Sequence, residues 1–484
     1  MKKDKIVIAN SVGKDDKGNY YIHFPSRWTA KVGKVQDFSY YPYELAYLSS
    51  LLKRETNLIV KMVDGNLLGL DVNKYINLIA KEKPDWLIME TASPLYHLDL
   101  QIARAMQKKF HCRVIFCGQH PTTFPSEVLK DGIDYVCLGE YEYTVLDILK
   151  GKKKKDILGL YPNKFREPLD INSLPFPEDN DISRMDYDNI GGCDYKEIEF
   201  FASRGCPFSC QFCVCGNLYY KSPNWRPRSI DNIIREIKYL KNKYPQMEGI
   251  FFDEEDHVVS KDYILKLTDA IIKNKLNNLK YDAMCGYIGI DKQMLTAMKQ
   301  AGYYKLRIGI ETASQKVAKI ALRKRIDIKK LKQVLTDAKD LGIRMYGTFT
   351  FGAPGSTKKE DQKTLELIKE LFEQNLIYDF QRSVCTPLPG TPFYNWAEKN
   401  NLLVSKNWDD YNGGTPLVRL PGYKKEDLLS IYDECGKIYL WHQIKTRHIG
   451  LLFDQFKRRG LLNTFKQSFF LVDYLFIGKL NKRQ

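Results

Sequence analysis

The sequence predicts two α/β domains, a doubly wound parallel sheet followed by a partial β/α barrel. Strand-like runs alternate with helical patterns in two blocks along the 484 residues, and a proline-containing stretch without periodicity separates the blocks. The runs are short and almost wholly apolar, as expected of strands that are buried on both faces of a parallel sheet. We place the domains at residues 1–150 and 193–415, the linker at 151–192 and a helical segment at 416–484.

The first block repeats strand and helix five times. Its strand-like runs are Ile6–Ala9, Leu58–Val63, Trp86–Met89, Val114–Cys117 and Tyr135–Leu138. The helical patterns are Tyr43–Lys53, Val72–Glu82, Leu98–Phe110, Pro125–Lys130 and Glu142–Leu149. This repeat predicts a doubly wound sheet, which binds ligands beyond the carboxyl ends of its strands. Residues 10–40 form an aromatic-rich insertion after the first strand, at that edge.

The turns after these strands are the candidate ligand loops. They are Asp64-Gly65-Asn66, Thr91-Ala92-Ser93-Pro94, Gly118-Gln119-His120-Pro121 and Gly139-Glu140. Glycine and proline allow tight turns and a close approach of the backbone to a ligand. The first turn carries neither GxGxxG nor GxxxxGK[ST], so the sequence gives no indication of a dinucleotide or a nucleoside triphosphate.

The second block repeats strand and helix about six times, which predicts a partial barrel. The strand-like runs are Ile198–Ala202, Gly249–Phe252, Tyr281–Met284, Lys305–Ile310, Met345–Phe351 and Asp379–Cys385. Active sites of such barrels form at the carboxyl ends of the strands. A cysteine-rich stretch, RGCPFSCQFCVCG, directly follows the first run.

Three cysteines of this stretch have the spacing C-x3-C-x2-C, namely Cys206, Cys210 and Cys213. A closed zinc site needs four ligands, and the chain offers no second C-x2-C pair. Soft sulfur ligands also favour an iron–sulfur cluster. Three thiolates on a [4Fe–4S] cube leave one iron open for chemistry. Cys215 fits no ligand position, and we expect it to pack.

The cysteine spacing, with Phe212 before the last cysteine, resembles that of the radical S-adenosylmethionine (SAM) enzymes. Four later segments resemble strand exits of the same family in the same order, namely Phe251–Asp256, Arg307–Thr312, Gly347–Gly355 and Thr386–Thr391. The resemblance implies a [4Fe–4S] cluster on the three cysteines, reduced by an external one-electron donor such as flavodoxin or ferredoxin. It also implies SAM contacts from Phe212, Asp253, Glu254, Glu311, Gly352 and Pro389.

The first block resembles the flavodoxin-like cobalamin-binding domain of cobalamin-dependent radical SAM enzymes. The implied cobalamin contacts are Asp64, Asn66, Ser93, Gly118, Gln119, His120, Gly139 and Glu140. Many cobalamin proteins have D-x-H-x-x-G, whose histidine binds cobalt, and this chain has Asn66 in its place. We therefore expect that no histidine of this motif ligates cobalt, and we interpret His120 as a polar residue of a ligand loop.

These resemblances imply an enzyme that moves a methyl group from methylcobalamin to an unactivated carbon through a 5′-deoxyadenosyl radical. One alternative keeps both cofactors but performs an oxidative cyclisation or rearrangement. A second is an RNA-modifying radical SAM enzyme, and a third is a non-catalytic cobalamin or iron–sulfur sensor.

The composition limits the partners and the compartment. The net charge is +16, yet the basic residues gather late in the chain, and we expect a small-molecule or lipid-like substrate and no nucleic acid. Helical patterns at Leu428–Leu452 and Gly460–Ile477 mix aromatic and basic residues, which suits either a lid over the barrel or a peripheral membrane contact. With no export signal or membrane span in the sequence, we expect a cytoplasmic enzyme, membrane-associated if that contact forms.

Overall fold

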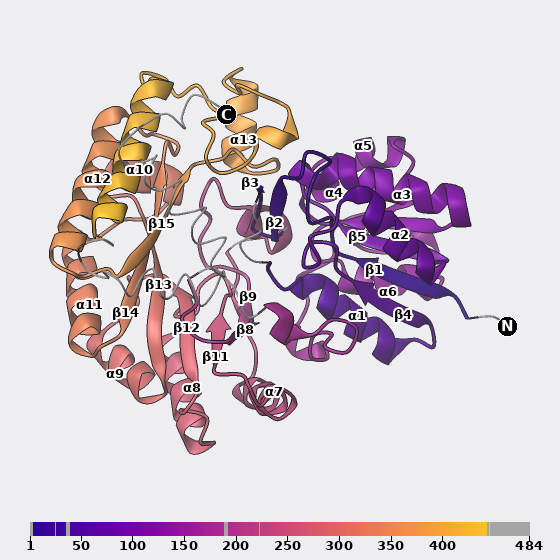
Figure 1. The fold of residues 1–484 in the computed structure, drawn as a ribbon, viewed down its shortest axis with the longest axis horizontal. Helices are drawn as coiled ribbons and strands as arrows, with labels where there is room; N and C mark the ends of the chain where they lie inside the picture. The colour runs from indigo at the N-terminus through magenta and orange to yellow at the C-terminus, as the bar shows by residue number, and fades with distance from the viewer. Residues whose placement is uncertain are drawn as a thin grey trace.

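The computed structural model describes residues 3–24, 26–34, 39–187, 192–221, 223–442 and 445. Two sheets lie next to each other, the first with helices on both faces and the second with helices along its outer side (Figure 1). Both are entirely parallel within their named strands.

The first domain is a five-stranded sheet with the order β4-β1-β5-β6-β7. The strands are β1 Lys5–Ala9, β4 Ile59–Val63, β5 Trp86–Glu90, β6 Arg113–Cys117 and β7 Tyr135–Val136. The helices are α1 Tyr43–Glu55, α2 Val72–Glu82, α3 Tyr96–Phe110, α4 Gln119–Thr123, α5 Pro125–Lys130 and α6 Glu142–Leu149. This is the strand order of flavodoxin-like sheets, so the predicted fold class is confirmed.

The pleat of the strands divides the first domain into two cores. Ile6 and Ile8 of β1 pack with α1 and α6, whereas Val7 and Ala9 pack with α2 and α3. Successive side chains of a strand point to opposite faces. An apolar residue at every position is therefore what a sheet covered on both faces requires.

The insertion after β1 forms an antiparallel hairpin of β2 Tyr20–Phe24 and β3 Trp28–Gly33. The side chains of Tyr21 and Phe24 are buried in the first-domain cores. The hairpin lies between the two domains (Figure 1). It therefore belongs to the first domain but borders the barrel.

The second domain is a six-stranded open barrel with the order β15-β14-β13-β12-β11-β8. Its strands are β8 Glu197–Phe200, β11 Gly249–Phe252, β12 Lys280–Cys285, β13 Tyr303–Glu311, β14 Arg344–Phe351 and β15 Asp379–Val384. Its helices are α7 Ile230–Lys243, α8 Lys261–Lys273, α9 Lys292–Gln300, α10 Gln315–Val317, α11 Ile328–Asp340, α12 Lys358–Glu373 and α13 Pro392–Lys399. All six predicted strands are present, which confirms the partial barrel.

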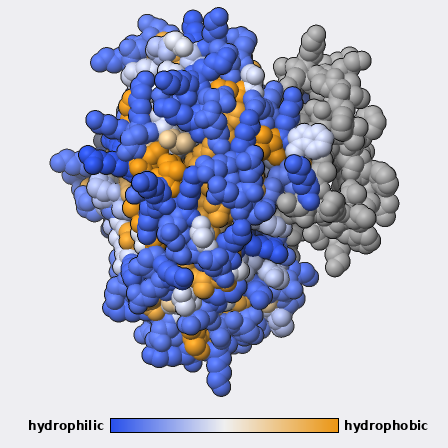
Figure 2. Space-filling model, turned by 90° about the vertical axis from the view of Figure 1, so that its left-hand side faces the viewer, coloured by the Kyte–Doolittle hydropathy of each residue, from blue (hydrophilic) through white to orange (hydrophobic). Residues whose placement is uncertain are grey.

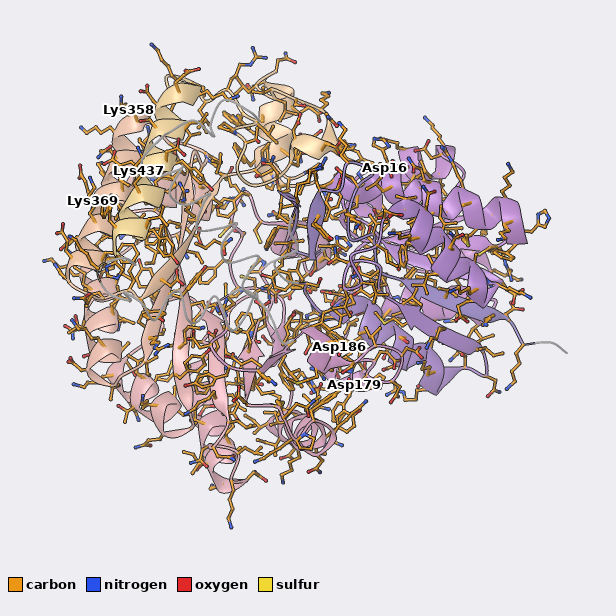
Figure 3. All side chains as sticks on the ribbon, viewed as in Figure 1. Asp16, Asp179, Asp186, Lys358, Lys369 and Lys437 are labelled. Atoms are coloured by element: carbon orange, nitrogen blue, oxygen red, sulfur yellow. The ribbon has the colours of Figure 1, made fainter. Side chains whose placement is uncertain are left out.

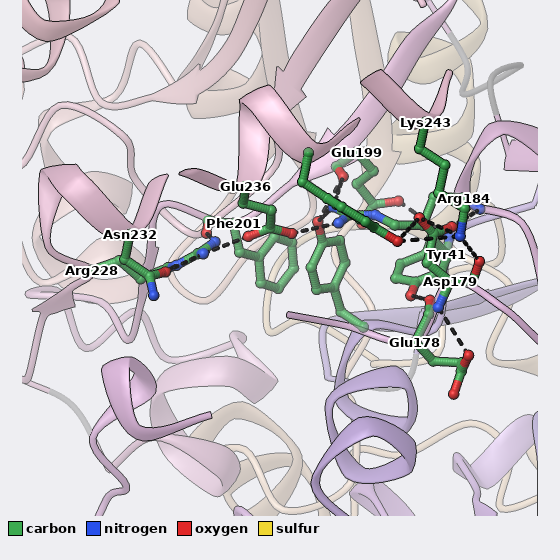
Figure 4. Close-up of polar contacts among 12 residues, drawn as sticks. Tyr41, Glu178, Asp179, Arg184, Glu199, Phe201, Arg228, Asn232, Glu236 and Lys243 are labelled. Carbon is green, nitrogen blue, oxygen red and sulfur yellow. Dashed lines mark hydrogen bonds and ion pairs between the residues drawn. The ribbon is translucent and has the colours of Figure 1, made fainter. Parts of the chain in front are cut away.

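The stretch predicted as a linker is packed between the domains. Its buried Arg184 donates to Tyr43 Oη (2.5 Å) and Glu199 O (3.0 Å) and pairs with Glu236 of α7, which also pairs with Arg228 (Figure 4). Asp179 and Asp186 of the stretch lie at the seam between the domains in Figure 3. Polar contacts to both domains hold this segment in place. Its described part forms no long helix or strand, and its sequence therefore lacks periodicity.

A helix over residues 425–442 packs along the last strand and α12. The Tyr439 ring packs edge-to-face against Phe380, with ring centroids 5.2 Å apart, and Lys369 pairs with Glu434 at 2.8 Å. The face that carries these helices is mainly hydrophilic, with apolar side chains visible between them (Figure 2). The remainder of the helix predicted at Leu428–Leu452, and the whole of Gly460–Ile477, lie outside the described residues. Among the described helices, none is long and apolar enough to cross a membrane.

The buried pair of Glu236 with two arginines gives a stability prediction. Glu236→Ala leaves both guanidinium groups buried without this carboxylate, so we expect a loss of about 3–5 kcal/mol, measured by denaturant unfolding. Glu370→Ala removes the partner of Lys332 in a half-exposed pair and serves as the control, with an expected loss of about 0–1 kcal/mol. Equal losses in the two variants would contradict the structural role of the buried pair.

Candidate active site

A cavity of about 590 Å³ lies at the carboxyl ends of the barrel strands. Residues of β11 to β15, the cysteine stretch and the first-domain hairpin line it. Its volume is in the range of about 300–1,000 Å³ that is typical of ligand pockets. Both domains therefore contribute to one site.

The three predicted cluster cysteines meet at this cavity. Cys206, Cys210 and Cys213 all line it and are partly exposed, whereas the other eight cysteines of the chain are buried. Asn217 fixes the loop, since its Nδ2 donates to the carbonyls of Cys210 (2.9 Å) and Cys213 (2.6 Å). The spacing thus brings three thiols to one wall.

Gly205, just before the first cysteine, has φ +88°, and a Cβ there would meet the Asn224 side chain and carbonyl. This is a conformation that L side chains rarely adopt. Glycine thus lets the chain turn from β9 (Ser203–Arg204) into the cysteine loop.

The three thiols differ in acidity. Burial raises the pKa of Cys210 to about 12 and also raises that of Cys206. The pKa of Cys213 is lowered to about 7, chiefly by a hydrogen bond from the Cys215 thiol and also by the Gly216 and Cys215 amides. The thiolate is the form that binds metals. Cys213 is therefore the most easily deprotonated of the three.

The cysteine set is too wide for a single ion. In the described part of the chain, the residues whose ligand atoms lie within 4.8 Å of one another are Cys193, Glu197 and Asp282, not the three loop cysteines. The Asp282 carboxylate pairs with Lys305 (3.1 Å) and Arg307 (2.6 Å). Two cations thus balance the two carboxylates of that cluster, which is an ion-pair network. A polynuclear cluster suits the wider set of thiols, and its donor chemistry fits iron and sulfide.

The acidic exit of β11 is placed differently from the prediction. Asp253, Glu255 and Asp256 line the cavity, but Glu254 does not. Glu254 Oε1 binds His257 Nδ1 (2.5 Å), and its Oε2 accepts a hydrogen bond from the Ala202 amide (3.3 Å). Glu254 therefore faces away from the cavity, and its contact with SAM stays a prediction. Glu255 and Asp256 were not among the predicted residues.

Glu311 lines the cavity at the end of β13 and is held in a defined orientation. Its two carboxylate oxygens accept hydrogen bonds from Thr348 Oγ1 (2.8 Å) and Thr350 Oγ1 (2.6 Å). Its φ is +64°, a conformation that residues other than glycine adopt mainly where surrounding structure enforces it, often at functional sites. Phe212 also lines the cavity.

The other two predicted SAM residues lie elsewhere. The Gly352 amide donates to Asp361 Oδ2 (2.8 Å), and the Pro389 carbonyl accepts from Gln119 Nε2 of the first domain (2.9 Å). Both residues belong to described segments, and neither lines the cavity. These two exits shape the barrel rim and the domain interface.

The eight predicted cobalamin residues surround the carboxyl edge of the first sheet but do not reach the cavity, although all eight are described. Asp64 accepts a hydrogen bond from Tyr187 Oη (2.5 Å), and Asn66 Nδ2 donates to the Tyr21 carbonyl (3.0 Å). Gly118 and Gly139 make turns with positive φ. Asn66 thus binds the insertion after β1, whereas Asp64 binds the stretch between the domains.

The remaining four meet the barrel side of the interface. Gln119 accepts hydrogen bonds from the Ser93 amide and hydroxyl, His120 lies 5.9 Å from the Trp408 ring, and Glu140 pairs with Arg204 and Arg226. Burial lowers the pKa of His120 to about 3, so this imidazole is neutral. Barrel and C-terminal residues thus cover the edge, and this set does not fit a corrin ring in the present arrangement.

Residues 201–368 match the Radical SAM superfamily. These residues thus form a radical SAM domain. Such a domain implies SAM and a [4Fe–4S] cluster, as the cysteine spacing indicated.

This radical SAM protein has similar curated relatives. The uncharacterized methyltransferase PH0819 of Pyrococcus horikoshii is 28% identical over 87% of this chain and 91% of its own length. The anaerobic magnesium-protoporphyrin IX monomethyl ester cyclase of Cereibacter sphaeroides is 22% identical over 88% of this chain and 71% of its own. The relatives thus include proteins named for methyl transfer and for cyclisation.

A solved structure shares the fold of both domains. It is that of the cobalamin-dependent SAM radical enzyme OxsB with aqua-cobalamin and SAM bound. The TM-score is 0.69 at 14% identity, over 98% of this chain and 72% of that one. The predicted two-domain architecture is therefore that of a known radical SAM enzyme.

Asp99, near the carboxyl edge of the first sheet, is a buried acid that titrates near neutral pH. Burial raises the pKa of Asp99 to about 7, although Ser11 Oγ donates to its Oδ1 at 2.5 Å. Between pH 4 and 7 the native state therefore keeps the Asp99 proton. The unfolded chain, in which this carboxyl has its ordinary pKa near 3.8, has lost it. Wild-type stability should then fall as pH rises from about 4 to 7, by at most about 1.4 kcal/mol per unit.

We expect Asp99→Asn to abolish this part of the pH dependence, because the amide does not titrate. Thermal unfolding across pH 5–8 measures it. Asp269→Asn, at an exposed position on α8, is the control that keeps the wild-type slope. A slope unchanged in Asp99→Asn would contradict the assignment.

Proposed function

We propose that this radical SAM protein binds a [4Fe–4S] cluster through Cys206, Cys210 and Cys213 and methylates an unactivated carbon of a small molecule with the help of cobalamin. One observation carries the cluster assignment: the three thiols line the same cavity as Asp253, Glu255 and Glu311. Thiolates for iron and carboxylates for a cationic ligand thus meet in one space.

Bound together, cluster and SAM supply reductive cleavage of SAM and a 5′-deoxyadenosyl radical. The protein's own residues bind and orient. The carboxylate of Glu311, oriented by two threonine hydroxyls, can accept hydrogen bonds from ribose hydroxyls or an ammonium group. Aromatic walls, including Phe212, Phe251 and Phe349, keep water from a reactive radical.

We assign cobalamin binding to the first domain. The support is the flavodoxin-like sheet and the similarity to OxsB, whose structure contains aqua-cobalamin. On the first-domain side, Trp28, Thr29, Ala30 and Val32 line the cavity and would face such a ligand. The eight turn residues do not, so we derive no chemical step through the cobalt.

An oxidative cyclisation is the second candidate function. Its support is the similarity to the magnesium-protoporphyrin IX monomethyl ester cyclase over 88% of the chain. The same cavity and cofactors would serve both reactions, and the product distinguishes them. A methylated product is heavier than its substrate by one CH₂ unit, whereas an oxidative cyclisation removes hydrogen.

The electron source is also part of the proposal. The chain has a single C-x3-C-x2-C motif, so we propose an external donor such as flavodoxin or ferredoxin. A peripheral membrane contact would involve the basic C-terminal segment, which lies beyond the described residues.

The cluster assignment predicts a contrast between two neighbouring cysteines. Cys213→Ala should lose most of its iron after anaerobic reconstitution and all SAM cleavage, because a ligand is missing. Cys215→Ala should keep about four irons per chain, because this thiol only packs and hydrogen-bonds. Iron and sulfide analysis with optical spectra measures both. Equal iron loss in the two variants would contradict the proposed ligand set.

Cobalamin dependence is tested by reconstitution with and without hydroxocobalamin, followed by cobalt analysis. We expect one cobalt per chain and a gain in thermal stability, since a ligand that binds only the native state stabilises it. Full cluster content without any cobalt would remove cobalamin, and with it methyl transfer of this kind, from the proposal.

A further inference from the structure

The tip of the first-domain hairpin reaches the acidic wall of the barrel cavity. Arg27 lies there, and its side chain is only 14% exposed. Its Nη1 donates to Asp253 Oδ1 (2.8 Å), and its Nε lies 3.7 Å from Glu255 Oε1. Arg27 and Asp253 are 226 positions apart in the sequence. One domain thus supplies the cation and the other the carboxylates.

Two aromatic rings fix the guanidinium in this position. Its carbon lies 4.8 Å from the ring centroid of Phe24 and 5.6 Å from that of Phe201. Phe24 belongs to the hairpin and Phe201 follows the first barrel strand. The side chain is therefore held by both domains and is not free to turn into solvent.

The hairpin tip also contacts the cysteine loop. The Cys215 sulfur lies 3.1 Å from the carbonyl oxygen of Ser26. The residue before Arg27 is therefore attached two positions beyond Cys213. The position of Arg27 over Asp253 is set relative to the cysteine loop.

Polar atoms around Arg27 have unused hydrogen-bonding capacity. Within the described chain, Arg27 Nη2, Asp253 Oδ2 and both carboxylate oxygens of Glu255 are buried without a hydrogen-bond partner. All three residues line the cavity. Buried polar groups in native proteins are nearly always hydrogen-bonded. Free acceptors on Asp253 and Glu255 suit a ligand that brings its own donors, such as the α-ammonium group of an amino acid.

We propose that Arg27 of the first-domain hairpin completes the SAM site of the barrel by holding Asp253 and Glu255 toward the amino-acid part of SAM. Arg27 is a positioning residue, because it acts through these carboxylates. SAM affinity then depends on the first domain even though the cluster ligands lie in the second. The inference rests on the proposed function of the cavity.

The test measures SAM binding directly, by anaerobic equilibrium dialysis of the full, cluster-loaded chain with labelled SAM. We expect Arg27→Gln to raise the Kd for SAM about tenfold or more, with unchanged iron per chain. Arg27→Lys keeps the charge but loses the two-pronged set of guanidinium donors. Its Kd for SAM should lie between those of Arg27→Gln and wild type. Lys31 on the same hairpin forms ion pairs with Asp15 and Asp409 outside the cavity. Lys31→Gln is therefore the control, and its Kd for SAM should stay within twofold of the wild-type value.

A double variant separates positioning from general damage. If Arg27 acts through Asp253 and Glu255, Arg27→Gln should weaken SAM binding less in an Asp253→Asn background than it does in the wild-type chain. Full additivity would overturn the inference. A Kd within twofold of wild type for Arg27→Gln would also overturn it, as would a loss of iron and thermal stability that Arg27→Lys does not restore.

The same experiment distinguishes this inference from the proposed function. If wild type holds no cluster or fails to bind SAM, the proposed function fails and the inference falls with it. If wild type binds and cleaves SAM while Arg27→Gln binds equally well, only the role of Arg27 is overturned.

Discussion

The buried pairing of Arg204 with Glu140 and Glu142 attaches the cysteine loop to the first domain. Arg204 is completely buried, two positions before Cys206, and lies 2.6 Å from Glu142 and 3.2 Å from Glu140. Arg226, on the strand that pairs with Arg204 at the far end of the loop, binds Glu140 as well (2.9 Å). An arginine buried this deeply cannot lose its proton or its carboxylate without a large cost. Both ends of the loop are therefore held by first-domain carboxylates, and the loop geometry depends on that domain.

Two tyrosines that follow the cysteines strengthen this dependence. Tyr219 Oη donates to Glu90 (2.9 Å) and Tyr220 Oη to Glu44 (3.0 Å). Burial raises the pKa of Glu90 well above its ordinary value. The first domain thus contacts the chain both before and after the cysteines.

The features that the sequence predicts are local, and the ones it misses are not. Strand runs follow from apolar patterning, and the thiols gather because Cys206, Cys210 and Cys213 lie within one loop. Arg27 could not be found this way, because its partner is 226 positions distant and only the domain arrangement unites them. The orientation of Glu254 away from the cavity had a usable signal in the sequence, since alternate residues at a strand exit point to opposite sides. That rule separates Asp253 and Glu255 from Glu254. The eight turn residues were expected to meet a ligand, but turn chemistry cannot reveal that another domain covers the turns.

Charge at the two ends of the barrel is arranged in opposite ways. Toward the amino ends of the strands, Asp282 is paired with Lys305 and with Arg307, which also reaches the cavity, and Glu197 accepts a hydrogen bond from Tyr304 (2.5 Å). At the carboxyl ends, neither oxygen of Glu255 accepts a hydrogen bond in the described chain. Burying an ionised carboxylate without donors is expensive, and folding alone gains nothing from it. The ion pairs of Asp282 explain the charges toward the amino ends of the strands as structural ones. The unsatisfied carboxylate at the second end is explained by a ligand that brings its own donors, which is why the thiols and the acids are best understood as one site.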